Sequence, residues 1–224
     1  MTAWEAAGKK LRCSVETLAR PPVSIAFPRV NVTPTRLPGA VVIEPRVFPD
    51  ERGFFSETYR RQWHQAAGIP PAELFIQDNH SRSTRGVVRG MHFHIGAGVA
   101  KLVRCSRGLI VDVIVDLRRG SPTYARWEAV ELDDEGLREL YVPVGFAHGF
   151  CVLSDVADVL YKQTAYYDPA VERGIAWNDP DVAIRWPPEI EPLVSARDAS
   201  APTLREMADE LPFVYDGEPV GEPR

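Results

Sequence analysis

The sequence has little cysteine, no excess of basic charge and no long apolar run. Its three cysteines, Cys13, Cys105 and Cys151, are widely spaced and odd in number, so they cannot by themselves form a disulfide framework or a zinc cluster. Lys and Arg total 26 against 31 Asp and Glu, with a formal net charge of -5, which argues against a nucleic-acid-binding surface. No apolar run approaches the roughly 20 residues that span a bilayer, and the N-terminus lacks a signal-peptide apolar region. We therefore expect a cytoplasmic protein in a reducing compartment, with neither a membrane nor a nucleic acid as partner.

The distribution of proline divides the chain into two parts. Four prolines fall between positions 21 and 34, a density that opposes both helix and central strand. We predict an N-terminal arm or extension at residues 1–35, ordered through packing on the body or on a partner subunit. The remainder, residues 36–224, has the length of one all-β domain.

Alternating polarity indicates strands through most of the body. In Leu109–Leu117, every second residue is apolar, while Asp112 and Asp116 alternate with isoleucines on the other face, which predicts a half-buried strand. Further strands are predicted at 127–132, 140–144, 147–153 and 157–164. Only residues 56–67 and 201–210 look helical. Many short strands with evenly spaced turns predict an all-β antiparallel sandwich or barrel with a few short peripheral helices.

Two histidine motifs make this prediction more specific. Gly86-x5-His92-x-His94 and the later Pro143-x-Gly145-x2-His148 resemble the two signature motifs of the cupin superfamily, whose fold is a double-stranded β-helix or jelly roll. Metal-binding cupins place a Glu shortly after the histidine pair, but residues 95–108 contain no carboxylate, and the ionisable residue nearest in sequence that could face the site is Lys101. An ammonium opposes a divalent cation, so we favour a metal-independent site. We interpret His94 as a solvated or hydrogen-bonded strand histidine.

Nine segments in order and in register carry a closer resemblance. They are Asp50–Glu57 (DERGFFSE), Gln77–Asn79, Gly86–His92, Lys101–Cys105, Asp112–Thr123, Tyr141–Phe150, Tyr161–Thr164, Tyr167–Pro169 and Ser195–Asp198. Together they are similar to the dTDP-4-dehydrorhamnose 3,5-epimerase family, over about residues 38–215. The N-terminal arm has no counterpart in this pattern.

The resemblance implies an isomerase of deoxysugar biosynthesis. It implies a dTDP-linked 4-keto-6-deoxy sugar as substrate, a jelly-roll fold, a homodimer, and no metal or redox cofactor. Carried over by position, His92 is the base, Asp198 its orienting partner, Tyr161 the acid on the opposite face, and Lys101 the cation beside the keto oxygen. The residues that would hold the nucleotide and sugar are Arg52, Phe55, Glu57, Gln77, Asn79, Arg89, His148 and Tyr167.

These residue types suit the reaction on chemical grounds. Inverting a carbon beside a ketone requires removal of its hydrogen, which leaves negative charge on oxygen as an enolate. A fixed cation such as Lys101 stabilises that charge more in the transition state than in the ground state. A histidine titrates near neutral pH, and a carboxylate on its second nitrogen fixes the tautomer and raises the basicity. A buried tyrosine can return the proton to the other face.

Each assignment has a structural alternative. Tyr161 shares a strand face with Val159 and could be a core tyrosine. Asp198 could be a turn residue or helix cap, Lys101 a solvated residue at a strand start, and His148 a structural histidine between two phenylalanines. The adjacent Arg118 and Arg119, beside a turn, are expected to face water.

Nucleotide binding poses a geometric difficulty. Arg52 and Arg89 are the candidates for the diphosphate, and Phe55 or Tyr167 offers a face for the base. Strict alternation puts Arg89 on the face opposite His92, unless a bulge at Gly90 brings them together. The segment from Arg52 to residue 57 could cross a dimer interface and complete the partner's site.

Two alternatives and several details stay open at this point. One alternative is a metal-dependent cupin enzyme such as a dioxygenase or isomerase, and the other is a non-catalytic sugar-nucleotide-binding protein. In the family the residue two after the base is usually Gln, whereas this chain has His94 and a small, glycine-rich loop at 95–100. Inversion at C3, at C5 or at both therefore remains open, as do the sugar and the nucleotide base.

Overall fold

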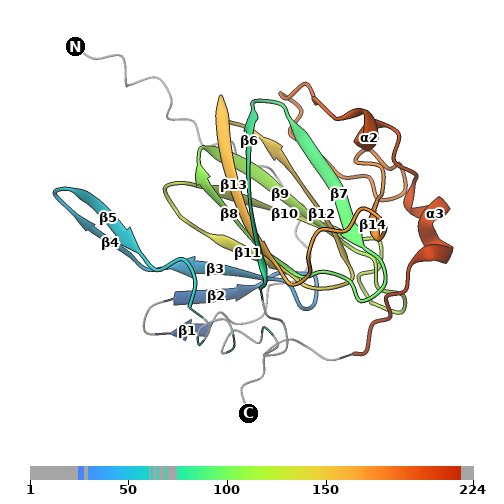
Figure 1. The fold of residues 1–224 in the computed structure, drawn as a ribbon, viewed down its shortest axis with the longest axis horizontal. Helices are drawn as coiled ribbons and strands as arrows, with labels where there is room; N and C mark the ends of the chain where they lie inside the picture. Colours follow the sequence, from blue (N-terminus) through green and yellow to red (C-terminus); the bar gives the residue numbers. More distant parts are fainter. Residues whose placement is uncertain are drawn as a thin grey trace.

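The computed structural model describes residues 25–27, 30–60, 62, 65, 69 and 75–217. In this part of the chain the fold is built almost entirely from β-strands, with two four-residue helices, α2 (Ala196–Ala199) and α3 (Leu204–Met207), and a 3₁₀ turn, η1 (Ala208–Glu210). Figure 1 shows the strands of two large sheets overlapping in the view, with α2 and α3 beyond the edge that carries β7 and β14. No helix among the described residues is long and apolar enough to cross a membrane.

Two antiparallel sheets form the body. The seven-stranded sheet has the order β1-β2-β3-β11-β8-β13-β6, and the five-stranded sheet has the order β10-β9-β12-β7-β14. The strands of the first, in that order, are Ile25–Phe27, Val30–Pro34, Val41–Pro45, Glu139–Val142, Lys101–Arg107, Val156–Gln163 and Gln77–Thr84. Those of the second are Trp127–Asp133, Leu109–Asp116, Phe146–Val152, Val88–His94 and Glu172–Gly174. A separate hairpin consists of β4 (Val47–Asp50) and β5 (Gly53–Ser56). Most neighbours in the two sheets, such as β8 and β13 or β12 and β7, are distant in sequence, as in the predicted jelly roll.

The largest apolar cluster fills the space between the two sheets. It combines Val103 and Val159 of the seven-stranded sheet with Ile114 and Phe150 of the five-stranded sheet. A second cluster, containing Met91 and Phe93, covers the outer face of the five-stranded sheet beneath α3. Because side chains alternate along a strand, these clusters fix which residues of each strand face the inter-sheet space.

The predicted strands of the body are present, with boundaries that differ by one or two residues. The strand predicted at 109–117 is β9, but it is buried on both faces, so the prediction of a half-buried strand was wrong. One face packs between the sheets, and the other is covered by the C-terminal residues, including Leu204 and Leu211. The alternating polarity misled because Asp112 and Asp116 are themselves buried.

The helix predictions were partly met. Residues 204–210 form α3 and η1 within the helix predicted at 201–210. Of the helix predicted at 56–67, residues 57–60 have no regular structure, Gln62 and Gln65 are helical, and the remaining positions of 61–67 lie outside the described residues. Within the predicted arm, β1 and β2 extend the large sheet through pairing of β2 with β3. A single domain at 36–224 stays a prediction.

Arg118 does not face water, contrary to the expectation for this turn. Its guanidinium donates to both carboxylate oxygens of the fully buried Asp116, at 2.9 and 2.8 Å, and lies over the rings of Phe146 and Tyr215. Burial alone would raise the pKa of Asp116, but the hydrogen bonds from Arg118 and Ser121 lower it below its usual value. Arg119, by contrast, is exposed as expected.

Replacing Arg118 with Met should lower the free energy of unfolding by about 3–5 kcal/mol, because Asp116 would keep a buried charge without its cation. The measurement is urea unfolding of the variant and the wild type at pH 7. Arg119→Met is the matched control, and its exposed side chain predicts a change within about 0.5 kcal/mol. Equal effects of the two substitutions would contradict a buried ion pair that stabilises this turn.

Candidate active site

The centre of the candidate site is a hydrogen-bonded pair, His92 and Asp198. The Nε2 atom of His92 lies 2.7 Å from Oδ1 of Asp198. His92 belongs to β7, whereas Asp198 comes from α2, 106 residues further along the chain. His92 keeps partial solvent exposure, and Asp198 is buried. This is the predicted arrangement of an imidazole oriented by a carboxylate.

Local sequence explains why Asp198 is held rigidly. Ser195 caps α2 by accepting a hydrogen bond from the backbone N–H of Asp198, at 3.0 Å. The cap is therefore Ser195 and not Asp198, which leaves the Asp198 carboxylate to His92 and to the backbone N–H of Gly90. Burial raises the pKa of Asp198, but the hydrogen bonds from His92, Gly90 and Ser195 outweigh it, so the net pKa is lowered. The carboxylate is thus ionised at neutral pH and accepts the Nε2 proton, which leaves Nδ1 of His92 as the basic nitrogen.

Lys101 and Tyr161 face the space between the sheets from the opposite side. Lys101 alternates with Val103 on β8, and Val103 pairs directly with Tyr161 on β13. Since Val103 belongs to the inter-sheet cluster, both side chains lie on that face. Lys101 is only 9% exposed, so the alternative of a solvated lysine at a strand start was wrong. Burial lowers its pKa to about 8, while Glu172 and Asp112 oppose this shift.

Tyr161 combines features of a core residue and of a site residue. It packs against the inter-sheet apolar cluster, as the core alternative predicted, but it is only partly buried. No described residue donates to or accepts from its hydroxyl group in the hydrogen bonds of the structure. Burial, followed by the charge of Glu172, raises its pKa, whereas Arg89 lowers it. Tyr161 is therefore protonated at neutral pH and has a proton to donate.

A second histidine–carboxylate pair adjoins the first. His148 on β12 pairs in register with His92 on β7 and with Ile114 on β9. Its Nε2 lies 2.9 Å from Oδ1 of Asp112, and both residues are buried. Burial lowers the pKa of His148 more than Asp112 raises it. Sequence reasoning missed Asp112 as a site residue, although a carboxylate between two isoleucines on a buried strand requires a partner.

Arg89 lies on the His92 face because the strand is bulged. His148 of β12 pairs with His92, and Phe150 of β12 pairs with Arg89. The two pairs are two residues apart on β12 but three residues apart on β7, so β7 contains one extra residue. The extra residue reverses the alternation, as the sequence suggested for a bulge at Gly90. Gly90 has a φ of 131°, and a Cβ there would lie 2.5 Å from Cα of Gly149. Two facing glycines therefore permit the close approach that turns Arg89 toward Tyr161.

Three predicted substrate-binding residues gather at the edge strand β6. The amide of Gln77 donates to Oδ1 of Asn79 at 2.9 Å, and its Oε1 accepts the backbone N–H of Tyr167 at 2.9 Å. In register, Asn79 pairs with Tyr161, which places Gln77 and Asn79 on the inter-sheet face. Tyr167 is exposed beside them. Gln77 and Asn79 therefore provide polar groups at the border of the inter-sheet space, and Tyr167 provides an exposed aromatic ring next to them.

The remaining three predicted residues lie elsewhere. Arg52 and Phe55 belong to the β4–β5 hairpin and its turn, and Glu57 follows it. Figure 1 shows this hairpin projecting from the body on the side away from β7 and α2. Arg52 pairs with Asp50 at the hairpin tip and is 83% exposed. Within one chain, these residues therefore do not meet His92.

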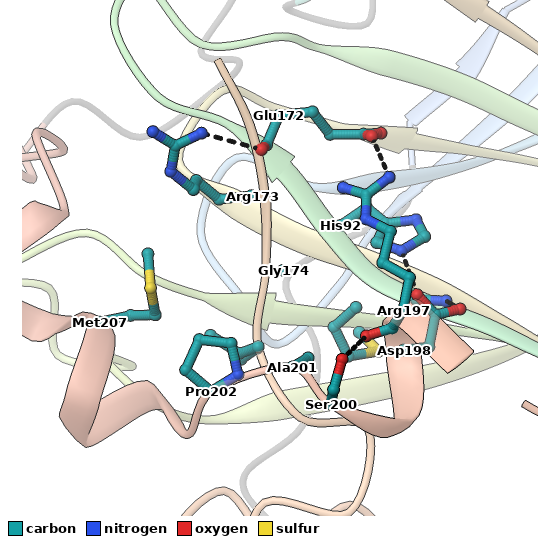
Figure 2. A pocket seen from close by; sticks show the side chains of 13 residues that line it. His92, Glu172, Arg173, Gly174, Arg197, Asp198, Ser200, Ala201, Pro202 and Met207 are labelled. Atoms are coloured by element: carbon teal, nitrogen blue, oxygen red, sulfur yellow. Dashed lines mark hydrogen bonds and ion pairs between the residues drawn. The ribbon is translucent and has the colours of Figure 1, made fainter. Parts of the chain in front are cut away.

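A pocket of about 260 Å³ adjoins the dyad from the side of α2 and α3. Figure 2 shows Glu172 and Arg197 across it, joined by an ion pair above His92 and Asp198. This pocket is not lined by Lys101 or Tyr161, which face the inter-sheet space instead. The sequence analysis did not single out Glu172 or Arg197. Arg197 had a signal, since it directly precedes Asp198, but Glu172 lies in a three-residue strand without recognisable periodicity.

The environment of His94 differs from both sequence expectations. It is 5% exposed, so it is not solvated, and no hydrogen bond joins its ring to a described residue. The residues described contain no group of three or more His, Cys, Asp or Glu side chains placed to hold a metal ion. His92 and His148 are each engaged by one carboxylate.

Comparison with known proteins gives a consistent result. A family model described as dTDP-4-dehydrorhamnose 3,5-epimerase matches residues 34–206. The dTDP-4-dehydrorhamnose 3,5-epimerase of Pseudomonas aeruginosa is 49% identical over 170 residues, which cover 75% of this chain and 93% of that protein.

Two solved structures extend the similarity to the fold. That of the epimerase from Legionella pneumophila, in complex with dTDP-4-keto-L-rhamnose, has a TM-score of 0.80 at 41% identity and covers 84% of this chain and 100% of that one. That of ChmJ, a 3′-monoepimerase from Streptomyces bikiniensis in complex with dTDP-quinovose, has a TM-score of 0.74 at 40% identity, with 80% and 92% coverage.

Proposed function

The chain belongs to the dTDP-4-dehydrorhamnose 3,5-epimerase family, and from this premise we propose that it epimerises a dTDP-linked 4-keto-6-deoxyhexose at C3, C5 or both. The observation that carries the proposal is the His92–Asp198 pair, which is set against a buried cation, Lys101, at the opposite sheet. The same family includes 3,5-epimerases and a 3′-monoepimerase, so the number of carbons inverted is left to experiment.

In the proposed reaction, Nδ1 of His92 takes the proton from the carbon beside the ketone. The C–H electron pair then forms the enolate, and the keto oxygen gains the negative charge. Lys101 stabilises this oxygen because its ammonium is buried at the site before the reaction begins. Tyr161 donates its hydroxyl proton to the same carbon from the other face, which inverts the centre. The positions of these groups on two facing sheets support reprotonation from opposite sides.

The direct test is solvent exchange. In D₂O, the protein should introduce deuterium at C3, C5 or both of dTDP-4-keto-6-deoxyglucose, far faster than a blank without protein, since each inversion passes through an enolate. Proton NMR follows each position separately. Exchange at only one carbon would define the regiochemistry, and the absence of exchange at both would contradict the proposed function.

We further propose that the protein acts as a homodimer in which each β4–β5 hairpin serves the partner's site. Phe54 and Phe55 of the hairpin are 59% and 65% exposed, and Phe48 beside them is also exposed. Three exposed aromatic rings on one projecting hairpin are characteristic of a protein–protein contact. An isologous dimer would use both hairpins equivalently and bring Arg52 to a second His92.

Complementation between two inactive variants tests this shared site. Arg52→Ala and His92→Asn should each be strongly deficient alone. Subunit exchange at equal amounts should restore about one quarter of the wild-type sites, because half of the dimers are mixed and each contains one intact site. Activity is followed after mixing, and subunit exchange is confirmed separately by native mass spectrometry. Arg60→Ala mixed with His92→Asn is the control, because half of the wild-type sites should be active both before and after exchange. A failure to recover activity in dimers known to be mixed would show that Arg52 serves its own chain.

A further inference from the structure

His94 is a buried polar residue that the proposed mechanism does not use. It is the last residue of β7, two positions after His92 and therefore on the same face of the strand. Its side chain points toward the inter-sheet space, where Lys101 also lies, and it is 5% exposed. Although both residues are buried, neither His94 nor Lys101 forms a hydrogen bond or ion pair through its side chain with any described residue.

The charges around His94 keep it neutral. Burial lowers its pKa first, and the ammonium of Lys101 lowers it further, while Glu172 and Asp168 act in the opposite direction with smaller effect. The Glu172 carboxylate is engaged by Arg197, and that of Asp168 accepts the backbone N–H of Ala170. A neutral imidazole has one N–H donor and one acceptor nitrogen. Among the described residues, the donor of His94 thus has no acceptor, and the ammonium of Lys101 has no carboxylate partner.

We propose that His94 is a second hydrogen-bond donor to the keto oxygen that Lys101 stabilises, so that the two side chains together form the oxyanion site of the enolate. Both side chains are buried and face the inter-sheet space from opposite sheets, and neither pairs with a described residue, so that together they define a place for one oxygen atom. Neutral imidazoles polarise carbonyl oxygens in other proton-transfer enzymes. The donor is more useful neutral than charged, because it adds a hydrogen bond without repelling Lys101.

This inference rests on the proposed function, and its test separates the two. His94→Leu removes the donor, whereas His94→Gln keeps an N–H donor on a flexible side chain. We expect kcat and the deuterium exchange rate to fall about 100-fold in H94L and by less than about tenfold in H94Q. The affinity for dTDP, which has no keto oxygen, should be unchanged in both variants. His80→Leu is the control, because His80 is an exposed histidine on β6 that pairs with Asp158.

A structural role would give a different pattern. If His94 only supported packing, H94L would lower thermal stability and dTDP affinity together with kcat, and that outcome would overturn the proposal. Full activity of H94L, or equal losses in H94L and H94Q, would overturn it as well. If H94L does not fold, His94→Asn, whose amide is too short to reach the oxygen, should show the same loss. Failure of the wild-type protein to exchange any proton would instead overturn the proposed function, and this inference with it.

Discussion

Replacing His92 with Asn is expected to lower kcat by about 10²–10⁴-fold and to abolish deuterium exchange at every carbon that the wild type exchanges. Asn preserves a hydrogen-bonding group opposite Asp198 but has no basic nitrogen, so the C–H bond cannot be broken. The measurement is proton NMR of the 4-keto sugar nucleotide in D₂O, together with the affinity for dTDP. The affinity for dTDP should be retained, since the His92–Asp198 pair is proposed to remove the proton and not to bind the nucleotide.

Tyr161→Phe is the matched comparison for this experiment. It removes the proposed acid and leaves His92 intact, so exchange should continue while formation of the inverted sugar falls. The two variants would then separate proton removal from proton return. Exchange by His92→Asn at the wild-type rate would rule out His92 as the base, and a loss of exchange in both variants would show that the two residues act as one unit.

Replacing Lys101 with Met is expected to lower kcat by about 10²–10³-fold, because the enolate oxygen would lose its preorganised cation. The pH dependence provides a second measurement. Burial lowers the pKa of Lys101 to about 8, so the ammonium is present below this pH and is lost as the pH rises through it. The kcat/KM of the wild type should therefore decline above pH about 8.

Lys101→Arg should move this decline to higher pH, since a guanidinium stays charged throughout the range. Lys162→Met is the control. Lys162 lies on the neighbouring strand β13, and its ammonium pairs with Asp78 and not with any group of the proposed site. An alkaline decline that persists unchanged in Lys101→Arg would assign the titration to another group. Full activity of Lys101→Met would remove the cation from the mechanism.

The fold was largely predictable because its signals are local. Alternation of apolar residues identified five body strands, β9 to β13, to within one or two residues, and the glycine-, proline- and aspartate-rich turns separated them. Two of the errors, the buried second face of β9 and the part-buried Arg118, concern aspartates that have a partner inside the protein. Asp112 is paired with His148, which the fold brings near, and Asp116 is paired with Arg118, two residues further along the chain. Sequence polarity indicates exposure only where no such partner exists.

The site was predictable in its residue types but not in its assembly. The family resemblance marked His92, Lys101, Tyr161 and Asp198 and paired Asp198 with His92, but no local pattern shows how α2 reaches β7 across 106 positions. Glu172, Arg197 and Asp112 were missed because their function depends on contacts of this long-range kind. The bulge that turns Arg89 was inferred only because the resemblance required both residues on one face.

By itself, the sequence determined the β-architecture and the family, and through the family resemblance it predicted the base and its cation. The tertiary structure alone decided that Asp112 pairs with His148, and that Lys101 and His94 are both buried without a side-chain partner among the described residues. It also separated the β4–β5 hairpin from the dyad of its own chain. The physical reason is that periodicity records which face of a strand a residue occupies, whereas pKa values, ion pairs and burial depend on the opposing sheet, which the local sequence does not encode.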